Sequence, residues 1–304
     1  MTGRSLLVAI AVTGGQLALG STGTTASTAG QEVTVVQVDL VDPSRATPAV
    51  PGVPASSSRT LETTVYLPAA VDPAPLIVLA HGAGGAPEKF TQLATYWADQ
   101  GYVVAMPRFP LTNDRVPQPV LGDFPEQGRD VRFVIDELLD RSAGVDDPLA
   151  GRIDPERLGL FGLSLGSLTV WSETFGDVPD ARVDAVVQSD GVTLVAEERI
   201  GSIDIPVLIA HSDVDPIFPY LDVVARYDGL VGPKFLLTLH GAGHATVGEN
   251  IEAAADTAYR EATTAFWDRT LGGVADAPFP LAVTGVTSFV DGARPAVWSI
   301  PATR

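Results

Sequence analysis

The middle of the chain contains a strand, a sharp turn and a helix in direct succession. Residues 157–163 form an apolar run typical of a buried strand, and residues 167–171 have helical sequence. Between them, residues 162–166 are Gly-Leu-Ser-Leu-Gly, a pattern that places Ser164 on a strand-to-helix turn. Such a turn strains the serine backbone, and side chains two residues away on either side would clash. The pattern predicts a nucleophilic serine, with a plain glycine-rich turn as the alternative.

The rest of the chain alternates segments typical of strands with segments typical of helices. Half-buried strands are expected over 32–39 and 59–67, and a continuous apolar run at 76–80 indicates a strand covered on both faces. Further strands are expected over 102–106, 183–188, 205–210 and 234–239, and helices over 87–99, 127–141, 220–228 and 249–268. The alternation predicts an α/β fold with a mainly parallel sheet, antiparallel at its start, and helices on both faces. No insertion is long enough for a large cap domain.

The beginning of the chain has the features of an export signal. Arg4 supplies a positive start, residues 5–19 are mostly apolar, and small residues follow. The apolar run is too short and too interrupted to span a membrane, and no cysteine follows it to carry a lipid anchor. We therefore expect residues 1–29 to be a signal peptide and 30–304 to be one secreted domain, with 272–304 as an edge element or a tail. A disordered cytoplasmic leader is the alternative.

Composition narrows the class of protein and its partners. The 304 residues are 45% hydrophobic and 18% charged, as in an ordinary globular protein. A formal net charge of −18 argues against nucleic acid and anionic membranes as partners. The chain has no cysteine, which excludes disulfides, thiol nucleophiles and cysteine-bound metals. We expect a monomer.

A serine hydroxyl becomes a strong nucleophile when a base accepts its proton. The chain has four histidines; His81 follows the third strand, too early for the base, and His211 lies on the strand end that carries the acid. His240 and His244 both follow the strand at the end of the parallel series. His244 is the predicted base, because a glycine-containing turn can carry it over Ser164, whereas His240 continues the strand. A structural, hydrogen-bonded histidine fits His240 better.

The base needs a carboxylate that fixes its tautomer and stabilises its charged form. Asp215, followed by Pro-Ile-Phe-Pro, is the first choice. Asp190, after the preceding strand, is the main alternative, and Asp213 is of the kind that caps a turn. The chain order Ser164, Asp215, His244 is the order expected for a hydrolase of this architecture.

A tetrahedral intermediate needs backbone N–H donors aimed at its oxyanion. Leu165, which follows the nucleophile, is predicted to supply one. The glycine-rich loop at 81–84 follows the third strand, where the second donor is required, and Ala83 is predicted to supply it. A simple glycine-rich turn is the alternative, and the loop lacks the Gly-Lys-Ser/Thr ending of a phosphate site.

These motifs resemble those of the α/β-hydrolase superfamily, most closely the branch of dienelactone hydrolases and bacterial platelet-activating-factor-acetylhydrolase-like esterases. The resemblance covers roughly residues 59–271. Its motifs are His81-Gly-x-Gly84, Gly162-Leu-Ser-Leu-Gly166, Asp215-Pro-Ile-Phe-Pro219 and Gly241-Ala-Gly-His244. The resemblance implies the α/β-hydrolase fold and hydrolysis of a small or polymeric carboxylic ester through an acyl-enzyme. It implies no metal and no organic cofactor.

The chain departs from some members of that superfamily. Bacterial cutinases and polyester hydrolases are similar around Asp215 and His244, but this chain has no tryptophan just after the strand at 183–188 and no cysteine pair. Dienelactone hydrolases proper have a cysteine nucleophile. Polyester depolymerisation, acyl transfer and a cofactor-free perhydrolase remain alternatives on the same triad, and a non-catalytic binding protein is a further one.

An apolar substrate pocket is expected near the turn that carries the serine. Its candidate residues are Leu163, Phe218 and Trp171. Helix core is the alternative for Trp171. The acyl length and the alcohol group of the substrate stay open.

Overall fold

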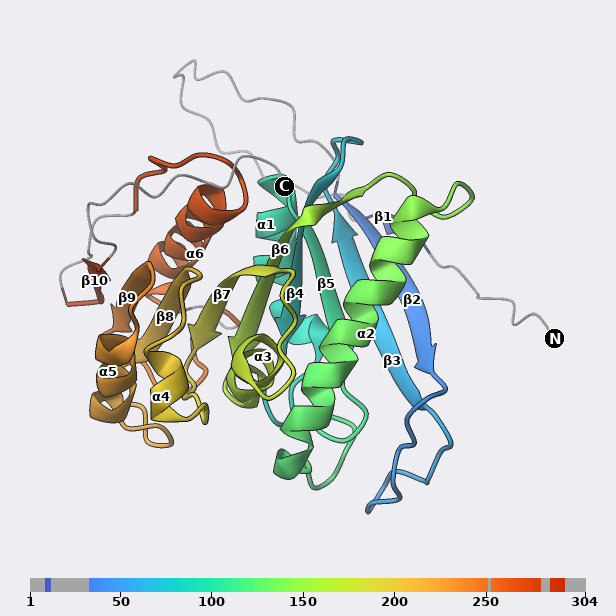
Figure 1. The fold of residues 1–304 in the computed structure, drawn as a ribbon, viewed down its shortest axis with the longest axis horizontal. Helices are drawn as coiled ribbons and strands as arrows, with labels where there is room; N and C mark the ends of the chain where they lie inside the picture. The colour runs from blue at the N-terminus through green and yellow to red at the C-terminus, as the bar shows by residue number, and fades with distance from the viewer. Residues whose placement is uncertain (1–8, 12–32, 251–252, 280–284, 293–304) are drawn as a thin grey trace, which may run out of the picture.

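The computed structural model describes residues 9–11, 33–250, 253–279 and 285–292, which form one sheet covered by helices (Figure 1). Its strands are β1 (Ala9–Ala11), β2 (Thr34–Asp42), β3 (Arg59–Leu67), β4 (Ala74–Ala80), β5 (Val103–Arg108), β6 (Ile153–Leu163), β7 (Val183–Ser189), β8 (Val207–Ser212), β9 (Lys234–Leu239) and β10 (Thr287–Asp291). The α-helices are α1 (Thr91–Asp99), α2 (Phe124–Ala143), α3 (Leu165–Phe175), α4 (Glu197–Ile200), α5 (Tyr220–Gly229) and α6 (Asp256–Thr270). Two 3₁₀ turns, η1 (Pro87–Phe90) and η2 (Leu121–Asp123), precede α1 and α2.

The strands lie in the order β1-β2-β3-β5-β4-β6-β7-β8-β9-β10. The series from β5 to β9 is parallel, with Val78 of β4 opposite Ala105 of β5 and Leu160 of β6. Antiparallel pairs flank it: β1 to β2, β2 to β3, β3 to β5, and β9 to β10. The predicted α/β architecture, mainly parallel with an antiparallel start, is confirmed.

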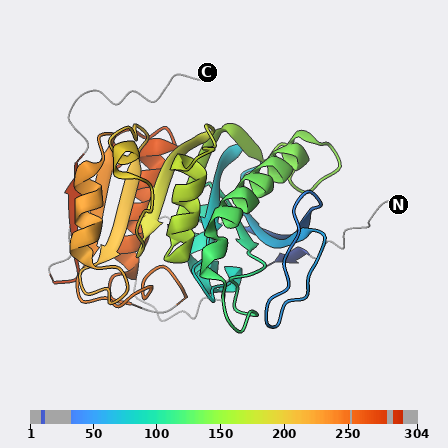
Figure 2. The ribbon, with the colours of Figure 1, turned by 60° about the horizontal axis from the view of Figure 1, so that its bottom comes forward.

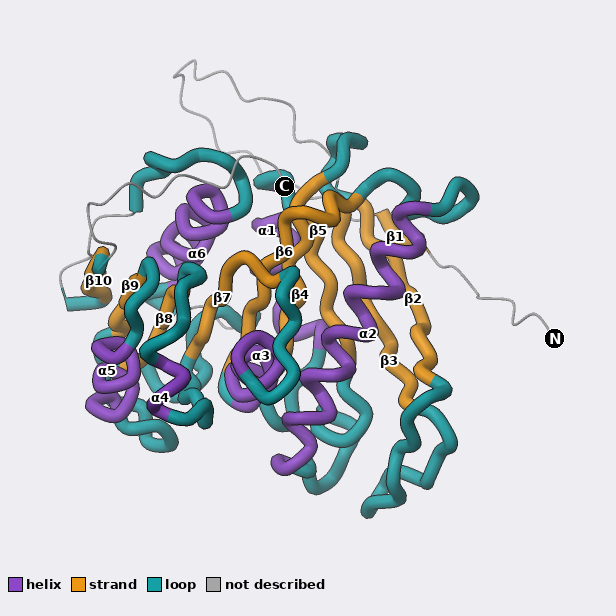
Figure 3. The backbone as a smooth tube through the Cα atoms, in the orientation of Figure 1, coloured by secondary structure: helices purple, strands orange, loops and turns teal. Residues whose placement is uncertain are grey.

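The helices form one layer on each face of the sheet (Figures 1 and 3). Helices α2 to α5 cover one face, and α1 and α6 cover the other. The continuous apolar run of β4 serves both layers, because successive side chains of a strand point to opposite faces. Leu76, Val78 and Ala80 pack in the core beneath α2 and α3. Ile77 and Leu79 pack in the core beneath α1 and α6.

A buried ion-pair network holds the start of α2 against the antiparallel end of the sheet. Arg59 of β3 is buried, and its Nη2 lies 2.8 Å from Asp123 Oδ2 and 2.6 Å from Asp130 Oδ2. Arg45 adds a second cation, 2.7 Å from Asp130 Oδ1. The network therefore fixes the end of the long connection between β5 and α2.

Several helix boundaries differ from the expected ones. The helix expected from residue 127 begins at Phe124, and the helix expected from residue 249 begins at Asp256. The later start of α6 has a tertiary cause: the N–H of Asn250 donates to Lys89 O at 2.5 Å, so this segment docks on η1 instead of coiling. The Asp256 carboxylate then accepts the N–H of Ala253 at 2.7 Å and organises the turn before the helix.

Both ends of the chain are described only in part. At the C-terminal end, β10 pairs antiparallel with β9 at the edge of the sheet, within the segment 272–304 that was expected to be an edge element or a tail. The expected signal peptide lies outside the described residues except for β1. Among the described residues, no helix is both long and apolar enough to cross a membrane.

Candidate active site

The loops after the parallel strands open at one edge of the sheet, at the bottom of Figure 1 and turned forward in Figure 2. Side chains beyond the carboxyl ends of parallel strands are brought together in this way. The loops after β6, β7, β8 and β9 carry Ser164, Asp190, Asp213, Asp215, His240 and His244.

Ser164 occupies the turn between β6 and α3 in a strained conformation, with φ 54° and ψ −116°. The two flanking glycines make this turn possible. A Cβ on Gly162 would lie 2.2 Å from Gly166 O, and a Cβ on Gly166 would lie 2.0 Å from Ala80 O. Both distances are far below any van der Waals contact, so backbone packing on both sides of Ser164 requires glycine.

His244 reaches the serine from the loop after β9. Its Nδ1 lies 2.7 Å from Asp215 Oδ2, and its Nε2 lies 2.9 Å from Ser164 Oγ. A carboxylate accepts hydrogen bonds, so Nδ1 is the donor and Nε2 of the neutral ring is left as the acceptor. The Ser164 hydroxyl therefore donates to His244, in the geometry that proton removal requires.

Asp215 is held in place by its own loop. Its Oδ1 accepts the N–H groups of Ile217 at 2.7 Å and Phe218 at 3.0 Å, and its carboxylate is fully buried. Burial by itself raises the pKa of Asp215, but the hydrogen bonds from His244, Phe218 and Ile217 outweigh it and hold that pKa below its usual value. The carboxylate therefore stays ionised against the imidazole.

The alternative base and one alternative acid pair with each other instead. His240 Nδ1 lies 2.7 Å from Asp213 Oδ2, and the side chains are 36% and 31% exposed. The N–H of His240 donates to Val286 O at 2.9 Å, so this residue continues the sheet edge, as expected from the sequence. The hydrogen bonds of His240 thus hold it on Asp213 and the sheet edge, whereas His244 bonds to Ser164.

The two predicted oxyanion donors come from α3 and from the loop after β4. Leu165 is the first residue of α3, where helix geometry leaves an N–H without an intrahelical acceptor. The loop with Ala83 passes closely, since a Cβ on Gly82 would lie 3.1 Å from Ser164 Cβ. Ala83 itself is exposed.

His81 holds that loop from beneath as a neutral residue. Burial lowers its pKa to about 4. Its Nδ1–H donates to Gly82 O at 2.8 Å, and its Nε2 accepts the N–H of Phe109 at 3.2 Å. Gly84 adds a hydrogen bond from its N–H to Thr112 O at 2.7 Å. The loop is thereby tied to the connection after β5.

Two of the three expected pocket residues lie elsewhere. Trp171 is buried in the core beneath α2 and α3 and packs on Phe175, with ring centroids 4.8 Å apart. Leu163, the last residue of β6, points into the opposite core beneath α1 and α6. Phe218 is half-buried, with its ring 5.7 Å from that of His244. The pocket interpretation of Leu163 and Trp171 is therefore wrong, and Phe218 alone lies beside the base.

A charged cleft that was not foreseen from the sequence lies near the site. It has a volume of about 560 Å³ and is bordered by Glu88, Lys89, Arg108, Asp114, Arg115 and Glu249. Burial raises the pKa of Glu249, opposed by Lys89, whose Nζ lies 3.8 Å away. The only sequence signal was the position of Glu249 five residues after His244, which gives no indication of its neighbours.

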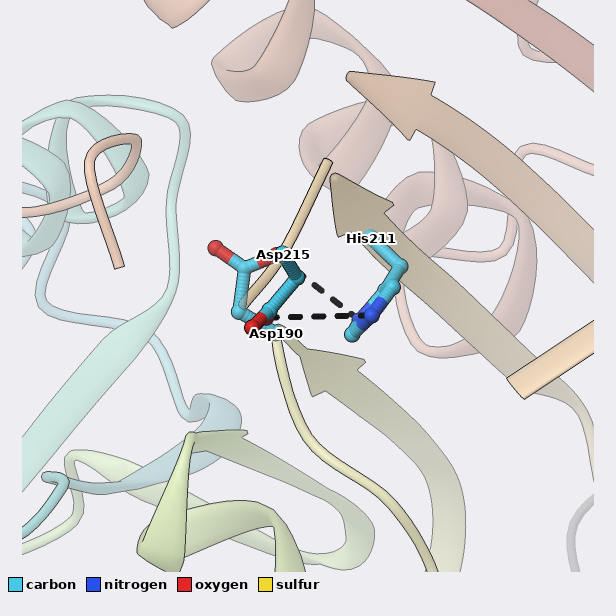
Figure 4. A group of neighbouring side chains, drawn as sticks. All are labelled: Asp190, His211 and Asp215. Carbon is cyan, nitrogen blue, oxygen red and sulfur yellow. Dashed lines mark ion pairs between the residues drawn. The ribbon is translucent and has the colours of Figure 1, made fainter. Parts of the chain in front are cut away.

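Asp190 and His211 form a buried group with Asp215 (Figure 4). Each of these three residues offers one atom that could bind a metal, and these atoms lie within 4.8 Å of one another. A metal would compete with His244 for Asp215 Oδ2 and with two backbone N–H groups for the oxygens of Asp190. The donor set therefore fits a hydrogen-bonded network better than a metal centre.

No protein-family model and no curated protein matches this chain.

Proposed function

We propose that this protein is a serine carboxylic-ester hydrolase with the α/β-hydrolase fold. The observation that carries the proposal is the hydrogen-bonded series from Ser164 Oγ through the His244 ring to Asp215. The strained turn at Ser164 and the order of the three residues after β6, β8 and β9 support it. Export of the protein is part of the proposal and rests on the leader sequence alone.

In the first half-reaction, Ser164 Oγ forms a bond to the ester carbonyl carbon while its proton passes to His244 Nε2. The N–H groups of Leu165 and Ala83 stabilise the oxyanion. The tetrahedral intermediate then collapses: the bond to the alcohol oxygen breaks, and His244 gives its proton to that oxygen. Asp215 holds the tautomer of His244 and stabilises its charged form throughout.

In the second half-reaction, water attacks the acyl carbon and gives a proton to His244. Collapse of the second tetrahedral intermediate releases the carboxylic acid and returns the proton to Ser164 Oγ. The reaction needs no electron transfer, and water is the co-substrate.

The test is hydrolysis of a series of p-nitrophenyl esters from short to long acyl chains, with wild type and Ser164→Ala compared. We expect the wild type to turn over at least part of the series and the variant to lose at least about 10³-fold in kcat. Full activity in Ser164→Ala would overturn the nucleophile. A folded wild type that is inert on every ester would favour a binding protein with the same fold.

A further inference from the structure

Asp190 connects the two backbone segments that carry the acid and the base. Its Oδ2 accepts the N–H of Ala245 at 3.0 Å, and its Oδ1 accepts the N–H of Ser212 at 3.0 Å. Ala245 directly follows His244, and Ser212 ends the strand that leads to Asp215. One buried carboxylate at the end of β7 therefore holds both loops.

The backbone at this junction is strained in an unusual way. Ser164, Asp190 and Ala245 have φ of 54°, 39° and 54°, and no other non-glycine residue of the described chain has a positive φ. Such conformations persist only where the surroundings hold them, and they concentrate at functional sites. The hydrogen bond from Ala245 to Asp190 joins two of the three strained residues, so it supplies the restraint that the conformation of Ala245 needs.

His211 extends the support to the acid loop. Its Nε2 donates to Phe218 O at 2.9 Å, and the N–H of Phe218 binds the Asp215 carboxylate. The ring lies beside both carboxylates, with Nδ1 3.7 Å from an oxygen of Asp190 and Nε2 3.7 Å from an oxygen of Asp215 (Figure 4). His211 therefore holds the acid loop by a hydrogen bond and adjoins Asp190 without one.

The two carboxylate oxygens of Asp190 indicate that this side chain does more than fill space in the core. A carboxylate offers acceptors on both oxygens, which matches two backbone donors from two loops. An asparagine of nearly the same shape has one acceptor oxygen and would turn its NH₂ group toward one of the two N–H groups. Burial raises the pKa of Asp190 despite these donors and the nearby His211. Keeping a charged carboxylate in the core at this position therefore costs free energy.

We propose that Asp190 is a positioning residue for catalysis: through Ala245 and Ser212 it sets His244 Nε2 toward Ser164 and Asp215 toward His244. The inference rests on the proposed esterase function. It adds a fourth side chain to the machinery, one that acts through the backbone of the two loops.

The test compares wild type with Asp190→Asn on the best p-nitrophenyl ester, with active sites counted by titration with a p-nitrophenyl phosphonate. We expect kcat per titrated site to fall about 10²-fold, because displacement of a catalytic group by about 1 Å has an effect of that order, with KM within about two-fold. The control is Asp177→Asn, which removes a carboxylate that is 97% exposed and should keep kcat within about two-fold. An Asp190→Asn protein with lower melting temperature but wild-type kcat per site would overturn the proposal.

Ala245→Gly keeps the measurement decisive if Asp190→Asn alone does not fold. Glycine adopts a positive φ without strain, so in this variant the backbone at residue 245 no longer depends on the hydrogen bond to Asp190 for its conformation. In the Ala245→Gly background, Asp190→Asn should still lower kcat, by less than in the wild type; no further decrease would overturn the proposal. A wild type without esterase activity would remove the proposed function and the inference with it, whereas an active wild type with an unaffected Asp190→Asn variant would remove only the inference.

Discussion

The Nδ1 atom of His240 lies 2.7 Å from the Asp213 carboxylate, the same distance that separates His244 from Asp215. The two pairs come from the same two loops, yet their surroundings differ. The His244 pair is nearly buried and continues to Ser164, whereas the His240 pair is exposed at the sheet edge. One protein thus contains a candidate catalytic pair and a matched control for it.

The first prediction uses this match. His244→Gln should lower kcat by at least about 10³-fold, because the base and the stabilised imidazolium are lost. His240→Gln should keep kcat within about two-fold. Steady-state hydrolysis of a p-nitrophenyl ester measures both, and equal losses in the two variants would contradict the assignment of the base.

The second prediction concerns the close packing at the serine turn. Gly166→Ala should destabilise the fold by more than about 3 kcal/mol, because its Cβ would lie 2.0 Å from a backbone oxygen. Gly122→Ala is the control: its Cβ would have no neighbour within 4 Å, so the free energy of unfolding should change by less than about 0.5 kcal/mol. Urea unfolding followed by circular dichroism measures the difference. Similar midpoints for the two variants would show that the turn tolerates side chains.

The third prediction concerns the buried network at β3. Arg59→Met leaves the buried carboxylate of Asp123 without its cation and weakens the pairing of Asp130, so we expect a loss of about 3–5 kcal/mol in the free energy of unfolding. Arg129→Met removes an exposed pair with Glu126 and should cost less than about 1 kcal/mol. Chemical unfolding distinguishes the two. If the network does not stabilise the fold, both variants will have the wild-type midpoint of unfolding.

The fourth prediction is a dependence of stability on pH that originates at His81. Burial lowers its pKa from 6.5 to about 4 in the folded protein. Between these values the unfolded chain binds a proton that the folded chain does not, so the contribution of His81 is complete above about pH 6.5 and is lost as the pH falls toward 4. The loss amounts to about 3 kcal/mol at most.

His81→Gln should flatten this pH dependence, since an amide can donate and accept hydrogen bonds but does not titrate in this range. His240→Gln, at an exposed position, should leave it unchanged. Urea unfolding at several pH values between 4 and 7 provides the slopes. A His81→Gln protein with the wild-type slope would assign the pH dependence to other groups.

Local features of the fold could be predicted from the sequence. The unbroken apolar run of β4 indicated burial on both faces, and its alternate residues do enter separate cores. The two glycines around Ser164 indicated a tight strand-to-helix turn, because the clash they avoid involves backbone only a few residues away or on the adjacent strand. The start of α6 could not be predicted in this way, because the contact of Asn250 with Lys89 joins segments far apart in the sequence.

The sequence by itself determined that the chain forms a mainly parallel α/β sheet with Ser164 on a sharp turn, because strand burial, helix periodicity and glycine requirements are local properties. Only the tertiary structure decided which histidine reaches that serine and which aspartate reaches that histidine. Ser164 and His244 are 80 residues apart, and their contact depends on strand order, on register and on the support of Asp190 beneath two loops. Trp171 shows the same division. Its apolar character is a property of the sequence, but the core that it enters is set by the packing of α3 on the sheet.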